Sequence, residues 1–106
     1  MTQYRNRLPQ LPKCLFLTDG GTETELIYTL GFELPCFASF HLLNDPKGYA
    51  AIQDYYRRHA EIANRYKVGL ILDSLTYRAS TDWGKELGYS KQGLDEINHA
   101  AINLLR

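Results

Sequence analysis

Apolar and polar positions follow a pattern along the chain that predicts two short buried strands separated by helices. Residues 14–17 and 68–72 are nearly continuous apolar runs bounded by turn residues, a pattern typical of strands in parallel sheets. Residues 1–13 are polar, contain prolines and are expected to form an extended lead-in. Because helical segments lie between the two runs, we expect a β-α-β unit whose strands pair in parallel.

Capping signals place the helices. Thr22 and Glu25 fit a capping box, which predicts a helix over about 22–30. An Asp-Pro pair is an N-cap and first-turn signal, and it predicts a long helix over about 45–67. Ser90 is expected to cap a last helix, after a loop that holds one short helix. The expected core-facing residues are Tyr49, Ile52, Tyr56, Ala60, Ala63 and Tyr66 in the long helix and Leu94, Ile97, Ala101 and Leu105 in the last one.

Two strands alone make an incomplete parallel sheet. Such a sheet cannot bury both of its faces, and both outer edges remain unpaired. We therefore expect the chain to be the opening part of a larger α/β protein. The sheet would be completed by the rest of that protein or by self-association of the chain.

Charge and cysteine content argue against several classes of function. The chain has 12 basic and 12 acidic side chains, so neither a nucleic acid nor a membrane is expected as a partner. No apolar run reaches membrane-spanning length, and residues 1–7 lack the apolar stretch of a signal peptide, so a cytoplasmic location is expected. Cys14 and Cys36 belong to no cysteine or histidine cluster, and neither is expected to bind a metal.

The turn Asp19-Gly20-Gly21, at the end of the first strand, is the main candidate binding site. The glycines permit a tight turn and leave backbone amides open to a ligand. A carboxylate beside free amides suits the ammonium and carboxylate groups of an amino acid. The alternative is an ordinary strand-to-helix turn with a solvated aspartate.

Four motifs occur in a fixed order along the chain. They are Thr18-Asp19-Gly20-Gly21-x-Glu23-Thr24, Leu34-Pro35-Cys36-Phe37-Ala38-x-Phe40, Leu72-Asp73-x-x-Thr76-Tyr77-Arg78-Ala79-x-x-Asp82-Trp83-Gly84 and Leu87-Gly88-Tyr89. Their order and spacing resemble the N-terminal part of the homocysteine S-methyltransferase family over residues 14–106. The resemblance implies the first βα repeats of a parallel (β/α)8 barrel, incomplete in this chain because such a barrel needs about 250 residues. It also implies methyl transfer to the sulfur of homocysteine, forming methionine.

The resemblance implies that this part of the protein positions the amino acid and does not activate its sulfur. Asp19 would pair with the substrate ammonium, and the amides of the two glycines would approach its polar groups. An aromatic face would suit a cationic methyl donor, and Trp83 is a further candidate for the pocket wall. The implied substrate-binding residues are Asp19, Gly20, Gly21, Thr76 and Tyr77.

The catalytic zinc of the complete enzyme is implied by the same resemblance, but its ligands are not present in this chain. The family's zinc-binding cysteines lie in later strands, including a Gly-Gly-Cys-Cys element that nothing here matches. No catalytic residue and no metal ligand is therefore expected in the chain, which alone should be inactive. The methyl donor cannot be assigned to a sulfonium, a betaine or a folate.

The chain departs from the family pattern at one further point, and two alternative functions remain. Thr22 and Glu23 stand where many relatives carry a Met-Gly pair, which indicates a divergent branch. The three histidines follow no ligand or catalytic spacing. The alternatives are a different barrel enzyme that binds a small carboxylate or phosphate, and a non-catalytic fragment that self-associates.

Overall fold

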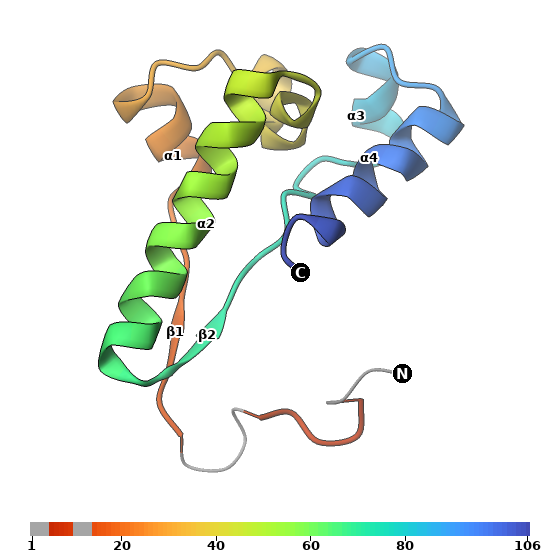
Figure 1. Ribbon diagram of the computed structural model, residues 1–106. Coiled ribbons are helices and arrows are strands. Elements are labelled where there is room, and N and C mark those ends of the chain that lie inside the picture. The colour runs from red at the N-terminus through yellow and green to blue at the C-terminus, as the bar shows by residue number, and fades with distance from the viewer. Residues whose placement is uncertain (1–4, 10–13) are drawn as a thin grey trace.

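The computed structural model describes residues 5–9 and 14–106. The chain is 58% helical, and its single small sheet consists of β1 (Phe16–Thr18) and β2 (Gly69–Ile71). The long helix α2 (Pro46–Tyr66) runs beside both strands, whereas α3 (Thr81–Glu86) and α4 (Lys91–Asn103) follow the loop after β2 (Figure 1). The predicted lead-in lies partly outside the described residues.

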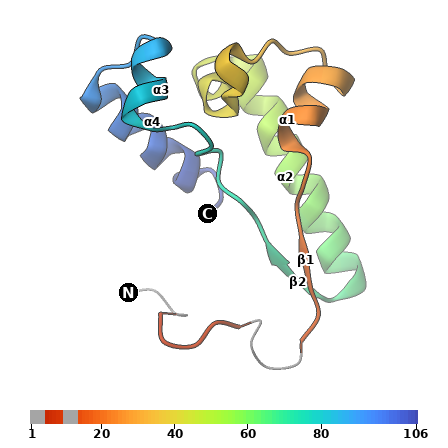
Figure 2. The same ribbon diagram turned by 180° about the vertical axis from the view of Figure 1, so that it is seen from behind.

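The two strands pair in parallel, as predicted. Phe16 lies opposite Gly69, and the register continues through Leu17 with Leu70 and Thr18 with Ile71. A side chain at position 69 would overlap the aromatic ring of Phe16, so the ring can lie over residue 69 only because that residue is glycine. Seen from behind, α2 again lies along the strand pair (Figure 2).

The predicted fold class, the first βα repeats of a (β/α)8 barrel, is wrong. The structure is mostly helical with one sheet of two three-residue strands, and it is not a set of repeated βα units. After β2, the described residues form the helices α3 and α4 and no further strand. The physical reason is the pattern beyond residue 72, where apolar side chains recur at helical and not at strand spacing.

The segment after β1 differs from the predicted capped helix. A three-residue helix, α1 (Thr22–Thr24), leads directly into a π-helix, η1 (Glu25–Thr29), and no side chain caps either one. The predicted capping box does not form, because Thr22 Oγ1 donates a hydrogen bond to the Tyr55 hydroxyl. Two short 3₁₀ helices, η2 (Pro35–Phe37) and η3 (Ser39–Asn44), lie between η1 and α2.

Both longer helices begin where their capping residues predict. The Asp45 carboxylate accepts from Gly48 N at 3.2 Å, and Ser90 Oγ accepts from Gly93 N at 3.0 Å. The core-facing side of α4 is confirmed at its three buried positions, Leu94, Ile97 and Ala101.

The core-facing side of α2 was predicted only in part. Ile52, Tyr56 and Ala63 are buried, as expected. Three other predicted positions, Tyr49, Ala60 and Tyr66, are exposed. Tyr55 is only 1% exposed, although the predicted stripe omitted it.

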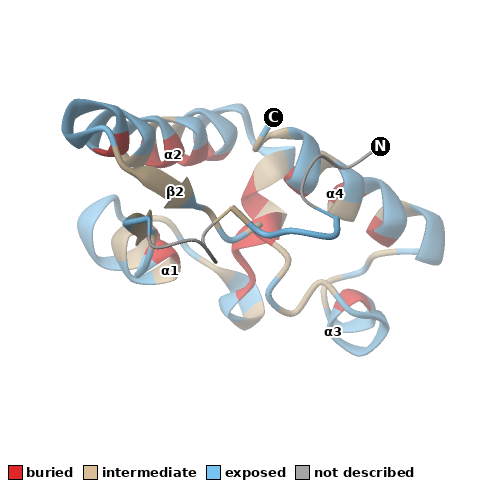
Figure 3. Ribbon diagram, turned by 90° about the horizontal axis from the view of Figure 1, so that it is seen from below, coloured by how far each residue is buried: buried red, intermediate tan, exposed pale blue. Residues whose placement is uncertain are grey.

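The hydrophobic core lies where α2, η3 and α4 meet. Buried positions lie along α2, along α4 and in the helical turns that lie between these two helices in space (Figure 3). The core members are Leu26, Ala38, Phe40, Leu42, Ile52, Tyr55, Tyr56, Leu75, Leu94, Ile97 and Ala101. Among the described residues, no helix combines the length and the apolar character needed to span a bilayer.

Candidate functional site

Asp19 follows directly after β1, and its hydrogen bonds link the carboxyl ends of the two strands. Its backbone N–H donates to Ile71 O at 3.3 Å, and its Oδ1 accepts from the backbone N–H of Asp73 at 3.0 Å. The side chain is half-buried. Because the strands are parallel, the residues that follow them, Asp19 and Asp73, lie at the same end of the sheet.

The Gly20-Gly21 turn is held by the hydroxyl of Tyr55 from α2. This hydroxyl accepts from Gly20 N at 3.2 Å and donates to Gly20 O at 2.8 Å, and it also accepts from Thr22 Oγ1 at 3.0 Å. Burial raises the pKa of Tyr55, so its hydroxyl stays protonated near neutral pH. The Gly20 amide therefore already has a partner. The Gly21 amide has none among the described residues, and Gly21 adopts a φ of 65°.

Tyr56 fixes the residue that follows β2. Its hydroxyl donates to the carbonyl oxygen of Asp73 at 2.6 Å. The pKa of Tyr56 is strongly raised, first by burial and then by the negative charges of Asp19, Glu23 and Asp73. We call these neighbouring groups at the end of the sheet the strand-end cluster: Asp19, Gly20, Gly21, Tyr55, Tyr56 and Asp73.

Thr76 and Tyr77, the other predicted site residues, make no hydrogen bond to Asp19 or to the two glycines. Thr76 Oγ1 forms a hydrogen bond of 2.8 Å with Ser74 Oγ. Tyr77 is 53% exposed and meets Phe37 edge to face, with the ring centroids 6.5 Å apart. The structure therefore brings Asp19 and the two glycines together with Asp73, and places Tyr77 in a separate aromatic group.

An arginine occupies the aromatic faces that were expected to wall the pocket. The guanidinium carbon of Arg78 lies 5.2 Å from the ring centroid of Tyr77 and 4.2 Å from that of Trp83. We call Phe37, Tyr77, Arg78 and Trp83 the aromatic–arginine cluster. A cationic methyl donor on these faces would meet a resident positive charge.

The cysteines and histidines form no metal centre within residues 5–9 and 14–106. Cys14 is exposed and Cys36 is half-buried, and neither forms a disulfide. His59 and His99 donate from Nδ1 to the carbonyl oxygens one turn earlier in their own helices. His41 Nδ1 lies 2.9 Å from the hydroxyl of Tyr89. The described residues do not fit a zinc site.

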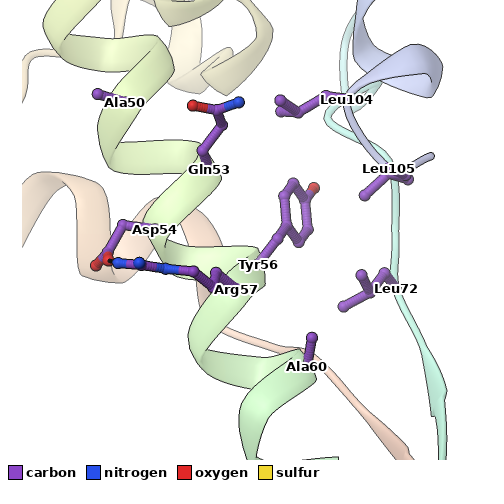
Figure 4. A pocket seen from close by; sticks show the side chains of 9 residues that line it. All are labelled: Ala50, Gln53, Asp54, Tyr56, Arg57, Ala60, Leu72, Leu104 and Leu105. Carbon is purple, nitrogen blue, oxygen red and sulfur yellow. Dashed lines mark hydrogen bonds and ion pairs between the residues drawn. The ribbon is translucent and has the colours of Figure 1, made fainter.

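A groove of about 580 Å³ lies between α2 and the leucines that follow β2 and α4 (Figure 4). Leu72, Leu104 and Leu105 face the helix across the groove, and the ring of Tyr56 lies between the two sides. Asp54 and Arg57 line the helix side and form an ion pair with each other. None of the predicted substrate-binding residues lines this groove.

Sequence reasoning missed the two groups that organise these clusters. Tyr55 could have been found from helical geometry, because it lies one turn from Ile52 on the same face of α2. The Arg78 contacts depend on loops from distant parts of the chain, and no local sequence pattern predicts them.

Comparisons with protein-family models, with curated proteins and with solved structures give no match.

Proposed function

We propose that the chain binds homocysteine through the strand-end cluster and positions it for methyl transfer to its sulfur. The observation that carries this proposal is the Asp19 carboxylate, fixed at the end of β1 by the Asp73 amide. The described residues supply no other partner for this carboxylate, so its second oxygen remains available to a substrate ammonium. The Gly21 amide would receive the substrate carboxylate.

The electrostatic setting of the cluster supports an ammonium ligand. Asp19 and Asp73 follow adjacent parallel strands, and neither forms an ion pair within the described part of the chain. Their charges act together on Tyr56, whose hydroxyl lies next to Asp73. Two nearby carboxylates favour a positively charged partner.

This proposal limits the chain to binding and orientation. A thiol reacts as its thiolate, and an ordinary cysteine-like thiol ionises near pH 8.5, so methylation needs a group that deprotonates the sulfur. The described residues offer no group of side chains that could hold a zinc ion. The groups that activate the thiol and deliver the methyl would belong to polypeptide other than this chain.

Isothermal titration calorimetry of the purified chain tests the binding step. Homocysteine and 4-mercaptobutyrate are titrated separately into the chain, because 4-mercaptobutyrate keeps the carbon chain, the thiol and the carboxylate of homocysteine but lacks its ammonium. Asp19→Asn retains the acceptor for the Asp73 amide and removes the charge, and it should weaken homocysteine binding about tenfold or more. Asp95→Asn, at an exposed position of α4, is the matched control. Equal affinities for the two ligands, or an unchanged dissociation constant in Asp19→Asn, would disprove the proposal.

Self-association is the second candidate function, favoured by the open edges of the sheet. Each strand has one neighbour within the described residues, so each presents an outer edge of unpaired backbone groups. Leu15 and Ile71, beside and within these strands, are 68% and 36% exposed. Sedimentation velocity at micromolar concentration should give a dimer or larger species, and Ile71→Lys should shift it towards the monomer. A monomer for the unmodified chain would reject this candidate.

A further inference from the structure

The side chain of Arg78 is held in place from three sides. Its guanidinium lies over the rings of Tyr77 and Trp83, and its Nη1 donates to the carbonyl oxygen of Cys36 at 2.7 Å. Arg78 itself is half-buried. The Arg78 guanidinium thus contacts residues from the loop after β2, from α3 and from η2.

The backbone on both sides of this contact adopts the left-handed region. Arg78 has a φ of 61°, and Cys36 and Phe37 have φ values of 56° and 57°. Residues other than glycine occupy this region at an energetic penalty, so both segments are held there by surrounding contacts. The guanidinium is therefore oriented before any ligand arrives.

The contacts with the two rings leave hydrogen-bonding capacity on the guanidinium. An arginine carries five N–H donors in one plane, and contact of its charge with a ring face uses no oxygen or nitrogen acceptor. Only the bond to Cys36 is formed within the described part of the chain, and no carboxylate pairs with Arg78 there. Arg57 and Arg58 on α2, by contrast, are paired with acidic side chains.

The aromatic side chains around Arg78 are accessible. Phe37 is 41% exposed, Tyr77 is 53% exposed and Trp83 is 37% exposed. The indole N–H of Trp83 and the hydroxyl of Tyr77 make no hydrogen bond to another described residue, so they are two further donors. A positive charge, several in-plane donors and apolar rings are thus presented together.

We propose that the aromatic–arginine cluster is an oxyanion-binding site that takes a carboxylate or phosphate group attached to a small apolar body. The guanidinium edge binds two oxygens of the anion as a fork, and the aromatic rings contact the apolar body. Nothing in this site depends on Asp19 or on the binding of homocysteine. Its ligand is opposite in charge to the ammonium group assigned to the strand-end cluster.

Fluorescence of Trp83 reports on this site directly, because the chain contains one tryptophan and Arg78 lies over its ring. The full chain is titrated separately with cyclohexanecarboxylate and with inorganic phosphate, and chloride at the same ionic strength serves as the control. A saturable change with either probe is expected, and the tighter probe identifies the source of the oxyanion. No saturable change with either, or an equal change with chloride, would overturn the proposal.

Two variants assign the effect to the guanidinium. Arg78→Gln should weaken binding of the tighter probe tenfold or more. Arg78→Lys, which keeps the charge but cannot form the fork, should weaken it less. Arg65→Gln, in the exposed last turn of α2, is the control and should bind as the unmodified chain does. Circular dichroism checks the fold, and if Arg78→Gln fails to fold, the lysine variant decides. Unchanged affinity in a folded Arg78 variant would refute the site.

Discussion

Replacing Tyr55 with phenylalanine should separate the contribution of one buried hydroxyl from that of the ring that carries it. The ring is 1% exposed and belongs to the core, and phenylalanine preserves its shape. The hydroxyl accepts hydrogen bonds from Gly20 N and Thr22 Oγ1 and donates one to Gly20 O. The substitution therefore removes three hydrogen bonds without opening a large cavity.

The three lost bonds are not equivalent. Gly20 is exposed, so water can replace the partner of its amide and its carbonyl oxygen at small expense. Thr22 is buried, and its hydroxyl would be left without a partner in the described surroundings. A buried unsatisfied donor costs about 1–3 kcal/mol, which sets the expected loss in the free energy of unfolding. For a chain of this size, each kcal/mol lowers the Tm by about 4–8 °C.

Urea denaturation followed by far-ultraviolet circular dichroism measures this loss. Tyr28→Phe is the matched control, because Tyr28 is 79% exposed and makes no side-chain hydrogen bond to the described residues. Its free energy of unfolding should stay within about 0.5 kcal/mol of the unmodified chain. Thr22→Val in the Tyr55→Phe background should recover much of this loss, because it removes the hydroxyl that the first substitution leaves without a partner. Equal stabilities of the Tyr55→Phe and Tyr28→Phe variants would refute the assignment of the hydroxyl as the clamp of the turn.

Two further predictions concern packing and pH. Gly48→Ala should destabilise the fold by roughly 1–3 kcal/mol, because the added Cβ would lie 2.6 Å from the Leu42 carbonyl oxygen, whereas Gly93→Ala at the equivalent position of α4, with its nearest atom at 3.2 Å, should change stability by less than about 1 kcal/mol. Equal losses in the two variants, measured by urea denaturation, would contradict this reasoning. The pKa of Tyr56 is raised from 10.0, so its contribution to stability is complete below pH 10 and is lost as the pH rises through its folded value. Alkaline denaturation of Tyr56→Phe should therefore show a weaker pH dependence, and an identical profile would count against the buried hydroxyl bond to Asp73.

The elements with local signals were predictable from the sequence. The apolar runs around residues 16 and 70 form strands, and Asp45 and Ser90 cap α2 and α4 as their positions indicate. Each of these signals depends on side chains within a few residues of one another. The parallel pairing follows from them, because a helix between two strands reverses the chain twice.

The wrong predictions concern features that depend on distant contacts. Thr22 and Glu25 match a capping box, but Tyr55 takes the threonine hydroxyl and Arg58 pairs with the glutamate. Each side chain therefore exchanges a local partner for one more than thirty residues away. The prediction of barrel repeats was also wrong. They were inferred from motif resemblance, whereas the pattern after Leu72 supports helices that pack on η3 and on each other.

The segment that joins the two candidate sites explains how both can persist in a chain with so small a sheet. Asp73 is bonded at its amide to Asp19 and at its carbonyl oxygen to Tyr56, and five residues later Arg78 is bonded to Cys36. Between these anchors, Leu75 is 3% exposed and lies in the core. A loop tied at both ends and buried at its centre loses little further conformational freedom when a ligand binds. The residues of the two clusters are therefore held in place by the core around α2, and not by the two short strands.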